Sequence, residues 1–345
     1  MSSGIFKREE NLFKEAKDHF ENNILDQEKY RELLKGYEKL LKQTKRLVKM
    51  SDRTEAELNQ LSKEQVKLNQ TLSDQNNKLE TLSSKLSKYL SPQVYDSIFS
   101  GKSEVRVGAN RKYLTVFFSD IASFTEISDQ FEPEILTKSL NAYLNEMAVI
   151  AIRHGATIDK YIGDAIMAFW GAPIDAEDHA ERGVVAAIKM IEALDVLAKV
   201  CVERGWPAIS IGIGINTGDM SVGDMGSKIR KAYTVMGDAV NLGARLEGLT
   251  RQYGVWTIVS EFTVAECPRV RFRELDKVLV KGKEQPVVIF EPVALESDLD
   301  DHAKRELEFW DGLLEGYRCQ KFEQVKKGLD SIVIEFGDRP LYDWL

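Results

Sequence analysis

The chain has 345 residues, a net charge of −8 and 43% hydrophobic residues, a length and composition that predict a globular protein of about two domains. No apolar run approaches the roughly 20 residues of a membrane span, and the first ten residues lack the apolar core of a signal peptide. The three cysteines, Cys201, Cys267 and Cys319, form neither a metal-binding spacing nor a disulfide framework. These features predict a cytoplasmic protein without a membrane span.

Charge is distributed unevenly along the chain. Residues 1–92 carry a net charge of about +3, and the remaining residues carry about −11. An acidic main part argues against nucleic acid as the principal ligand. It is compatible with a single nucleotide bound through metal ions.

Residues 26–90 are predicted to form one long helix, preceded by a shorter helical segment over 1–25. Residues 1–91 contain no proline, and eighteen positions spaced three and four apart run from Tyr30 to Tyr89, ten of them Leu. A repeat of 3.5 residues supercoils helices against a partner, and 1.5 Å per residue makes the rod about 90 Å long. We expect a parallel coiled coil in a homodimer; the alternative is a helix folded back as a hairpin within one chain.

Residues 91–110 are predicted to be a joint between this rod and the next domain. Ser91 and Pro92 are good residues for the start of a short helix over 93–99, and Gly101 is suited to end it.

Residues 111–293 are predicted to fold as one catalytic domain in which strands alternate with helices. Strands are expected at 113–119, 156–161, 166–170, 209–216, 232–236, 256–260, 271–280 and 287–292, and helices from about 132 to Gly155, at 179–203 and at 238–253. A glycine-rich passage at 218–226 is expected to link two of the strands. This order predicts a ferredoxin-like α+β sheet with helices on one face. Residues 294–345 are predicted to form a helical tail without chemistry of its own.

Two aspartates occupy similar surroundings in this domain. Asp120 follows the apolar strand 113–119, and Asp164 follows Gly163 between the two strands of a hairpin. Carboxylates at the ends of adjacent strands can hold a pair of hard cations over a triphosphate. Considered alone, either aspartate could instead be an ordinary turn residue.

Three motifs carry a resemblance to a known family. They are Phe118-Ser-Asp-Ile-Ala-Ser-Phe-Thr125, Lys160-Tyr-Ile-Gly-Asp164 and Tyr233-Thr-Val-Met-Gly-Asp-Ala-Val-Asn-Leu-Gly-Ala-Arg-Leu-Glu247. Their order and spacing closely resemble the class III nucleotidyl cyclases over residues 110–293, in particular the class IIIb-like bacterial enzymes. The rod and the short helix are similar to the signalling helix and transducer segment of many bacterial members. The resemblance implies a homodimer with active sites at the interface, each built from both chains.

The resemblance also implies the roles of individual residues. Asp120, Asp164 and the backbone of Ile121 are expected to bind two Mg²⁺ or Mn²⁺ ions. The triphosphate is expected to lie on the backbone of Ile121, Ala122, Ser123, Phe124 and Thr125.

The facing subunit is expected to supply the remaining groups. Asn241 orients the ribose, Arg245 stabilises charge on the transition state, and Lys281 binds phosphate. Asn241 and Arg245 are four residues apart and therefore share a helix face. The alternatives are a surface ion pair of Arg245 with Glu247 or another acid, and an ordinary hairpin turn at Lys281. Gly243, where the family more often has alanine, is expected only to loosen helix packing.

Lys160 and Thr234 are expected to determine whether the enzyme binds adenine or guanine. A lysine only donates hydrogen bonds, which suits N1 of adenine, and a threonine hydroxyl can accept from the adenine amino group. Guanine presents the opposite pattern. Thr234, where many relatives have Asp, also places the chain with a subgroup that includes bicarbonate-responsive enzymes, so bicarbonate is a candidate effector.

The sequence therefore predicts an adenylate cyclase that converts ATP into 3′,5′-cyclic AMP and pyrophosphate. A guanylate cyclase and a catalytically silent dimeric relay are the alternatives. The input is expected to come from a partner or an upstream sensor that acts on the rod.

Overall fold

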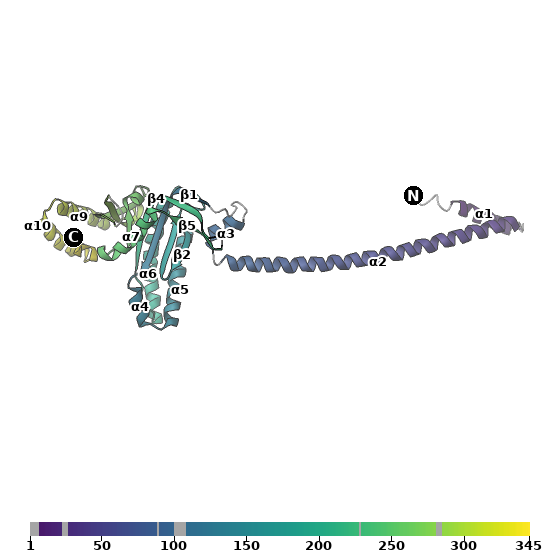
Figure 1. Ribbon diagram of the computed structural model, residues 1–345, viewed down its shortest axis with the longest axis horizontal. Coiled ribbons are helices and arrows are strands. Elements are labelled where there is room, and N and C mark those ends of the chain that lie inside the picture. Colours follow the sequence, from purple (N-terminus) through teal and green to yellow (C-terminus); the bar gives the residue numbers. More distant parts are fainter. Residues whose placement is uncertain (1–6, 23–26, 88–89, 100–107, 228, 281–284) are drawn as a thin grey trace. The chain divides into compact units, whose positions relative to one another are not determined.

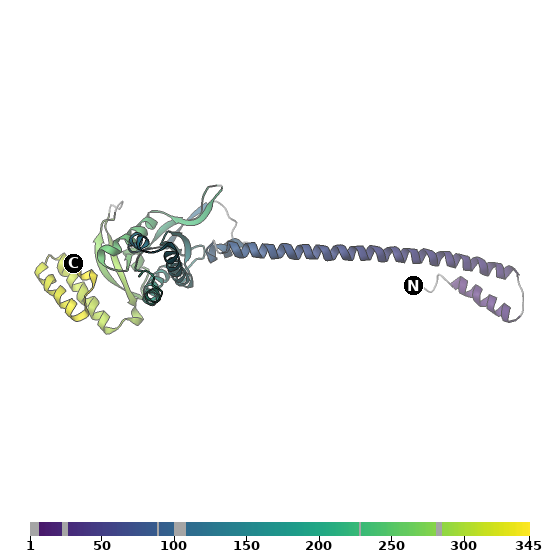
Figure 2. The ribbon, with the colours of Figure 1, turned by 90° about the horizontal axis from the view of Figure 1, so that it is seen from below.

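The computed structural model describes residues 7–22, 27–87, 90–99, 108–227, 229–280 and 285–345 (Figures 1 and 2). The chain divides into two compact units, residues 1–85 and residues 86–345. Within the described ranges, no helix combines the length and the apolar character that a membrane crossing requires.

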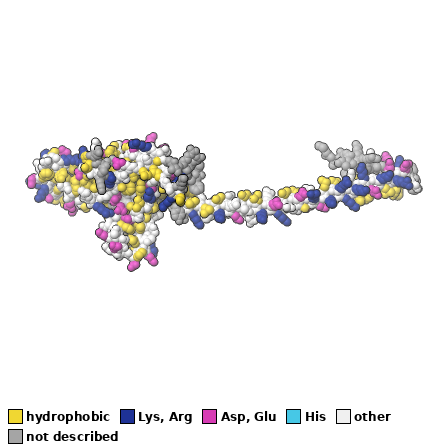
Figure 3. Space-filling model, in the orientation of Figure 1, with side chains coloured by type: hydrophobic (Ala, Val, Ile, Leu, Met, Phe, Trp, Pro, Cys, Tyr) yellow, Lys and Arg dark blue, Asp and Glu magenta, His cyan; other side chains and the backbone are white. Residues whose placement is uncertain are grey.

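The first unit consists of α1 (Lys7–Glu21) and α2 (Gln27–Leu86). α2 is a single helix of 60 residues in which none is buried, so the alternative of a hairpin within 27–86 is wrong. Its repeating leucines are solvent-exposed in the single chain, as Leu58 and Leu68 illustrate at 61% and 60% exposure. Hydrophobic side chains accordingly reach the surface at intervals along α2 in Figure 3.

The second unit is built around an eight-stranded mixed sheet with the order β2-β3-β1-β4-β6-β8-β7, in which β5 pairs with β4. The strands are β1 (Gly108–Ile121), β2 (Thr157–Ile162), β3 (Ala165–Trp170), β4 (Ile211–Gly226), β5 (Lys231–Met236), β6 (Thr257–Ser260), β7 (Val270–Val278) and β8 (Val287–Leu295). The antiparallel order 2-3-1-4 of the first four strands is the expected ferredoxin-like one. The strand bounds differ from expectation mainly in β4, which continues through the glycine-rich passage 218–226 because this stretch pairs with both β1 and β5.

Helices cover both faces of the sheet, which corrects the expectation of one helical face. Successive side chains of a strand point to opposite faces, and in β1 Phe117 belongs to a core with Met147 of α5 (Pro133–Arg153) and Met190 of α6 (His179–Arg204). The neighbouring Val116 instead faces α7 (Asp238–Tyr253). Both faces of the central part of β1, residues 114–117, are therefore buried. The remaining short helices are α4 (Phe124–Gln130) and α8 (Glu261–Val264).

The joint helix α3 (Pro92–Phe99) is hydrogen-bonded to the sheet domain. The side-chain amide of Gln93 donates to the carbonyl oxygen of Ala156 at 2.6 Å, immediately before β2. β1 begins at Gly108, slightly before the expected start of the catalytic domain at 111.

The predicted helical tail consists of α9 (Asp301–Arg318) and α10 (Phe322–Phe336), followed by the short helix η2 (Pro340–Asp343). Both helices contribute to a core with β7 and β8, in which Trp310 is fully buried and donates its indole N–H to the carbonyl oxygen of Glu274 at 2.7 Å.

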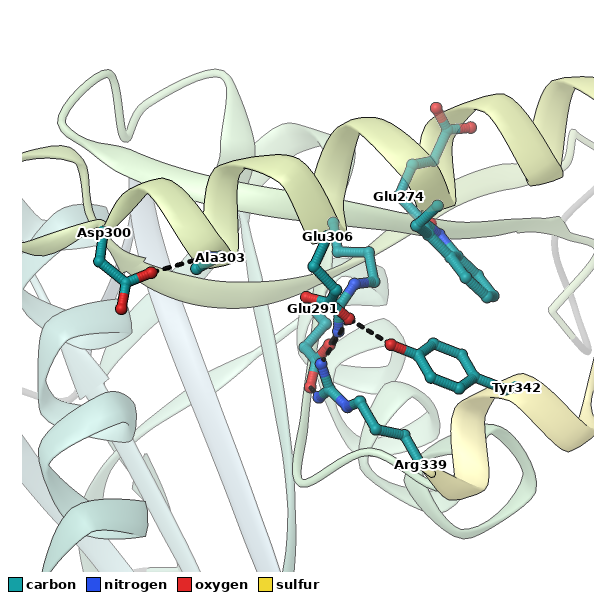
Figure 4. Close-up of polar contacts among 9 residues, drawn as sticks. Glu274, Glu291, Asp300, Ala303, Glu306, Arg339 and Tyr342 are labelled. Atoms are coloured by element: carbon teal, nitrogen blue, oxygen red, sulfur yellow. Dashed lines mark hydrogen bonds and ion pairs between the residues drawn. The ribbon is translucent and has the colours of Figure 1, made fainter. Parts of the chain in front are cut away.

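A buried ring of charges fixes the end of the tail on the sheet (Figure 4). Arg273 of β7 is fully buried and bonds both Glu291 and Glu306. Arg339 bonds the same two carboxylates at 3.2 Å each, and the hydroxyl of Tyr342 donates to Glu306 at 2.5 Å. Burial would raise the pKa of the Glu306 carboxyl, but these arginines and Tyr342 outweigh it and hold the pKa below its usual range. The tail is thus part of the folded domain.

Candidate active site

Asp120 and Asp164 converge at one edge of the sheet. Asp120 is next to last in β1, and Asp164 lies in the two-residue turn between β2 and β3. Gly163, the other turn residue, has φ +68°, a left-handed conformation that glycine adopts without steric cost. The Ile121 N–H donates to Oδ2 of Asp164 at 3.0 Å. The turn therefore brings the second carboxylate to the end of β1.

The two carboxylates lie close enough for Asp164 to affect the ionisation of Asp120. Burial, followed by the hydrogen bond and the charge of Asp164, raises the pKa of Asp120 to about 6. Burial and the charge of Asp120 also raise the pKa of Glu247 on α7 to about 7. Three acidic side chains thus share one partly buried region, where a cation is favoured.

An arginine of the same chain contacts this edge. Nη2 of Arg251 lies 3.4 Å from Oδ2 of Asp120 and 3.3 Å from the carbonyl oxygen of Ile121. It opposes the rise in the pKa of Asp120. The guanidinium therefore contacts the Asp120 carboxylate and the Ile121 carbonyl oxygen, which belong to residues predicted from the sequence to bind metal ions.

The expected phosphate-binding backbone is only partly available. Of its five N–H groups, that of Ile121 donates to Asp164 and that of Ala122 donates to the carbonyl oxygen of Ser210 at 2.8 Å. Both donors therefore have acceptors within the chain in this structure, and their assignment to phosphate stays a prediction. Ser123 adopts a left-handed conformation with φ 54° and begins α4. The backbone donors of Ser123, Phe124 and Thr125 lie at that helix start, where N–H groups lack acceptors within the helix.

Lys160 and Thr234, the two residues assigned to the base, are brought together by Asp159. The ammonium of Lys160 lies 3.2 Å from Oδ1 of Asp159, and the hydroxyl of Thr234 donates to Oδ2 of the same carboxylate. Thr234 is 8% exposed, whereas the Lys160 side chain is 45% exposed. A lysine donor and a threonine hydroxyl are thus adjacent, as the base hypothesis requires.

Asn241 and Arg245 lie on α7, which runs antiparallel to β4 at very short range. A Cβ on Gly214 would lie 2.3 Å from the carbonyl oxygen of Gly243, and a Cβ on Gly243 would lie 2.9 Å from Val116. Gly243 is therefore required by close helix–strand contact, which corrects the expectation that it only loosens packing. Asn241 is exposed, and Nη1 of Arg245 is buried without a hydrogen-bond partner in the described chain.

The direction of α7 separates two groups of site residues. Arg251, in the last turn of α7, lies at the edge of the sheet that carries Asp120. Arg245 lies six residues earlier, which is about 9 Å along the helix axis and about 120° around it from Arg251. Asn241 lies a further turn away. The ion pairs of the described residues include none between Arg245 and Glu247, the alternative considered above. Lys281, the remaining expected phosphate ligand, lies outside the described residues.

Sequence reasoning missed Asp159, Glu247 and Arg251. Asp159 directly precedes Lys160, but neighbours in a regular strand point to opposite faces. Arg251 lies on the predicted helix 238–253, but its contact with Asp120 depends on how that helix crosses the sheet, which local sequence does not reveal.

Residues 108–291 match the family model described as the adenylate and guanylate cyclase catalytic domain. The match covers more than half of the chain, and the chain belongs to this family. The resemblance stated from the three motifs is thereby confirmed.

Two curated relatives and two solved structures illustrate the likeness. Adenylate cyclase 1 of Rhizobium meliloti is 35% identical over 186 residues, which are 54% of this chain and 28% of that protein. The adenylate cyclase of Anabaena cylindrica is 37% identical over 216 residues, 60% of this chain and 41% of that protein. This chain thus spans less than half the length of these two relatives. The adenylyl cyclase CyaB from P. aeruginosa is 39% identical with a TM-score of 0.52, covering 56% of this chain and all of that one.

The guanylyl cyclase Cya2 is a comparable structural neighbour. It is 34% identical with a TM-score of 0.52 and covers 56% of this chain and 98% of that chain. Overall similarity therefore extends to cyclases of both kinds, and the choice of base must be argued from individual residues.

The close contact of α7 with β1 can be tested with two glycine-to-alanine substitutions on α7, one at the contact and one away from it. In Gly243→Ala the new methyl group meets the stiff, buried Val116, and we expect a loss of about 1–3 kcal/mol in the free energy of unfolding. We also expect a fall in turnover, because Asn241 and Arg245 move with the helix. Gly248→Ala, with no atom within 4 Å of its Cβ, should stabilise the protein by up to about 1 kcal/mol. Urea unfolding of both variants measures this, and equal behaviour of the two would contradict the packing argument.

Proposed function

We propose that this protein is an adenylate cyclase that forms 3′,5′-cyclic AMP and pyrophosphate from ATP. In this reaction the ribose 3′-oxygen bonds to the α-phosphorus, the bond to pyrophosphate breaks, and the 3′-hydroxyl loses its proton. The observation that carries the proposal is the convergence of Asp120 and Asp164 at the end of β1, in a chain that belongs to the cyclase family.

The residues at this edge suit two divalent cations. Asp120, Asp164 and the carbonyl oxygen of Ile121 are hard oxygen ligands, and a cation would offset the burial and the neighbouring Asp164 carboxylate that raise the pKa of Asp120. The described residues hold no group of three or more His, Cys, Asp or Glu arranged for a metal ion, so phosphate oxygens of the substrate would complete the coordination. When bound, such ions acidify the 3′-hydroxyl and withdraw charge from the triphosphate. Arg251 must move away from Asp120 and Ile121 for this to occur.

Adenine is favoured over guanine by the two residues joined through Asp159. Lys160 supplies a donor for adenine N1, and Thr234 supplies an acceptor for its 6-amino group. Guanine would present a donor to Lys160 and an acceptor to Thr234. The bicarbonate response suggested by Thr234 rests on that residue alone and stays a prediction; a flat response of initial rate to bicarbonate at fixed pH would exclude it.

The separation of Asn241 and Arg245 from the carboxylates supports a shared site in a homodimer. The unpartnered, buried Nη1 of Arg245 is suited to a phosphate oxygen held on the carboxylates of a second chain. Asn241, which is exposed on the same helix face, would position the ribose. Each dimer would contain two such sites.

The exposed leucine repeat of α2 supports regulation through a parallel coiled coil. The repeat is unburied in one chain, and α3, which follows α2, is hydrogen-bonded through Gln93 to Ala156 at the start of β2, the strand of Lys160. We therefore propose that a partner or an upstream sensor changes the pairing of α2 and thereby the site.

Single-residue insertions between Leu86 and Ser87 measure this coupling. Each insertion turns the rod by about 100° relative to α3, so cyclic AMP formation should rise and fall with a period of about seven residues. A steady decline with insertion length would contradict regulation by register.

Product analysis tests the proposed reaction. Purified protein is given ATP or GTP with Mg²⁺ or Mn²⁺, and products are identified by chromatography. We expect cyclic AMP from ATP, at least about tenfold less product from GTP, and a loss of at least about 100-fold in Asp120→Asn with an unchanged thermal melt. Preferred turnover of GTP would support the guanylate cyclase. No product under any condition would contradict the proposed activity of the purified chain and leave either a rod locked in an inhibited register or the silent relay.

A further inference from the structure

The Asp159 side chain is fully buried and lies between the two residues that the proposed function assigns to the base. Its Oδ2 accepts the hydroxyl proton of Thr234, and its Oδ1 lies 3.2 Å from the Lys160 ammonium without making a hydrogen bond. Burying a carboxylate away from water is costly unless it is paired and hydrogen-bonded. Asp159 meets that condition through Lys160 and Thr234.

A defect in the β2–β3 ladder makes this arrangement possible. Ile158 pairs with Ala168 and Lys160 pairs with Met167, so Asp159 has no partner across the ladder. In a regular strand, adjacent side chains point to opposite faces. A β-bulge redirects one of them, and here the carboxylate and the ammonium of consecutive residues come within 3.2 Å of each other.

The hydrogen bond determines what Thr234 can offer to a base. A threonine hydroxyl has one proton and two lone pairs, so by itself it can donate or accept. Because its proton is held by Asp159, Thr234 presents only lone pairs to a ligand. It therefore accepts from the 6-amino group of adenine and opposes the O6 oxygen of guanine or hypoxanthine.

We propose that Asp159 is a positioning residue for base specificity, which acts by fixing the hydroxyl of Thr234 as an acceptor. This inference rests on the proposed function, since it concerns the base site of that reaction. It adds that specificity belongs to a three-residue unit, of which only Lys160 and Thr234 reach the base.

The test compares ATP with purine riboside 5′-triphosphate, which lacks only the 6-amino group. The ratio of kcat/KM for the two nucleotides isolates the contact to Thr234. For the wild-type chain we expect a ratio of about ten, the factor that one hydrogen bond of about 1.4 kcal/mol supplies. In Asp159→Leu the hydroxyl is free to turn, and the ratio should fall to about two or below. Because both rates come from one sample, the fraction of folded protein cancels.

Thr234→Val separates this role from a general structural one. The variant lacks the hydroxyl, so its own ratio should be near one, and adding Asp159→Leu should not change the ratio further. A wild-type ratio in Asp159→Leu, or an additional change in the double variant, would overturn the proposal. Asp159→Ala also removes the acceptor and serves if Asp159→Leu does not fold. Asp175→Leu, at an 87% exposed carboxylate that pairs with Lys112, is the matched control and should keep the wild-type ratio.

Displacement of a fluorescent ATP analogue measures the same preference without turnover. A chain that binds ATP more tightly than purine riboside triphosphate, loses that preference in Asp159→Leu and forms no cyclic AMP would contradict the proposed function while upholding this inference. If the chain forms cyclic AMP but its preference for ATP over purine riboside triphosphate does not depend on Asp159, the proposed function is upheld and this inference is overturned.

Discussion

The close contact of α7 with β4 and β1 is the constraint on which the candidate site depends. Gly214 has no side chain to separate the backbones, and a Cβ there would lie 2.2 Å from the Glu247 nitrogen. Gly243 allows the same approach toward Val116. With side chains at these two positions the helix would be displaced from the sheet. Because both are glycine, α7 can approach the sheet at short range, and it runs with its C-terminal end at the edge where β1 ends.

This orientation divides the functional groups of one chain. Glu247 and Arg251 are brought to Asp120, whereas Asn241 and Arg245 lie nearer the start of the helix and face another direction. In the proposed reaction, a nucleotide held on the carboxylates of one chain would lie toward the opposite end of α7 from the Asn241 of that chain. The proposed homodimer would resolve this, because an isologous contact places each half-site opposite its complement. The exposed leucines of α2 also favour a dimer, since a coiled coil that buries them needs a second chain.

The sequence pointed to residues that the structure brings close together, whereas it did not predict several of their contacts. Asp120, Asp164, Lys160 and Thr234 could be assigned because strand ends, turns and motif spacing are local features. The order of the first four strands followed from the alternation of strands and helices. The link made by Asp159 was not predictable, because a β-bulge depends on how two strands pair. The acceptors of the Ile121 and Ala122 N–H groups, the position of α7 on the second face and the role of Gly243 likewise depend on tertiary packing, which periodicity does not specify.

In the proposed homodimer, a complete site combines the carboxylates of one chain with Arg245 of the other. The most direct test is to co-express Asp120→Ala and Arg245→Ala chains with different tags and to purify the heterodimer. Each variant alone should be inactive, whereas the heterodimer contains one site with neither substitution and should form cyclic AMP at about half the wild-type rate per dimer. A heterodimer as inactive as the separate variants would show that both sets of residues act within one chain, and would contradict the account.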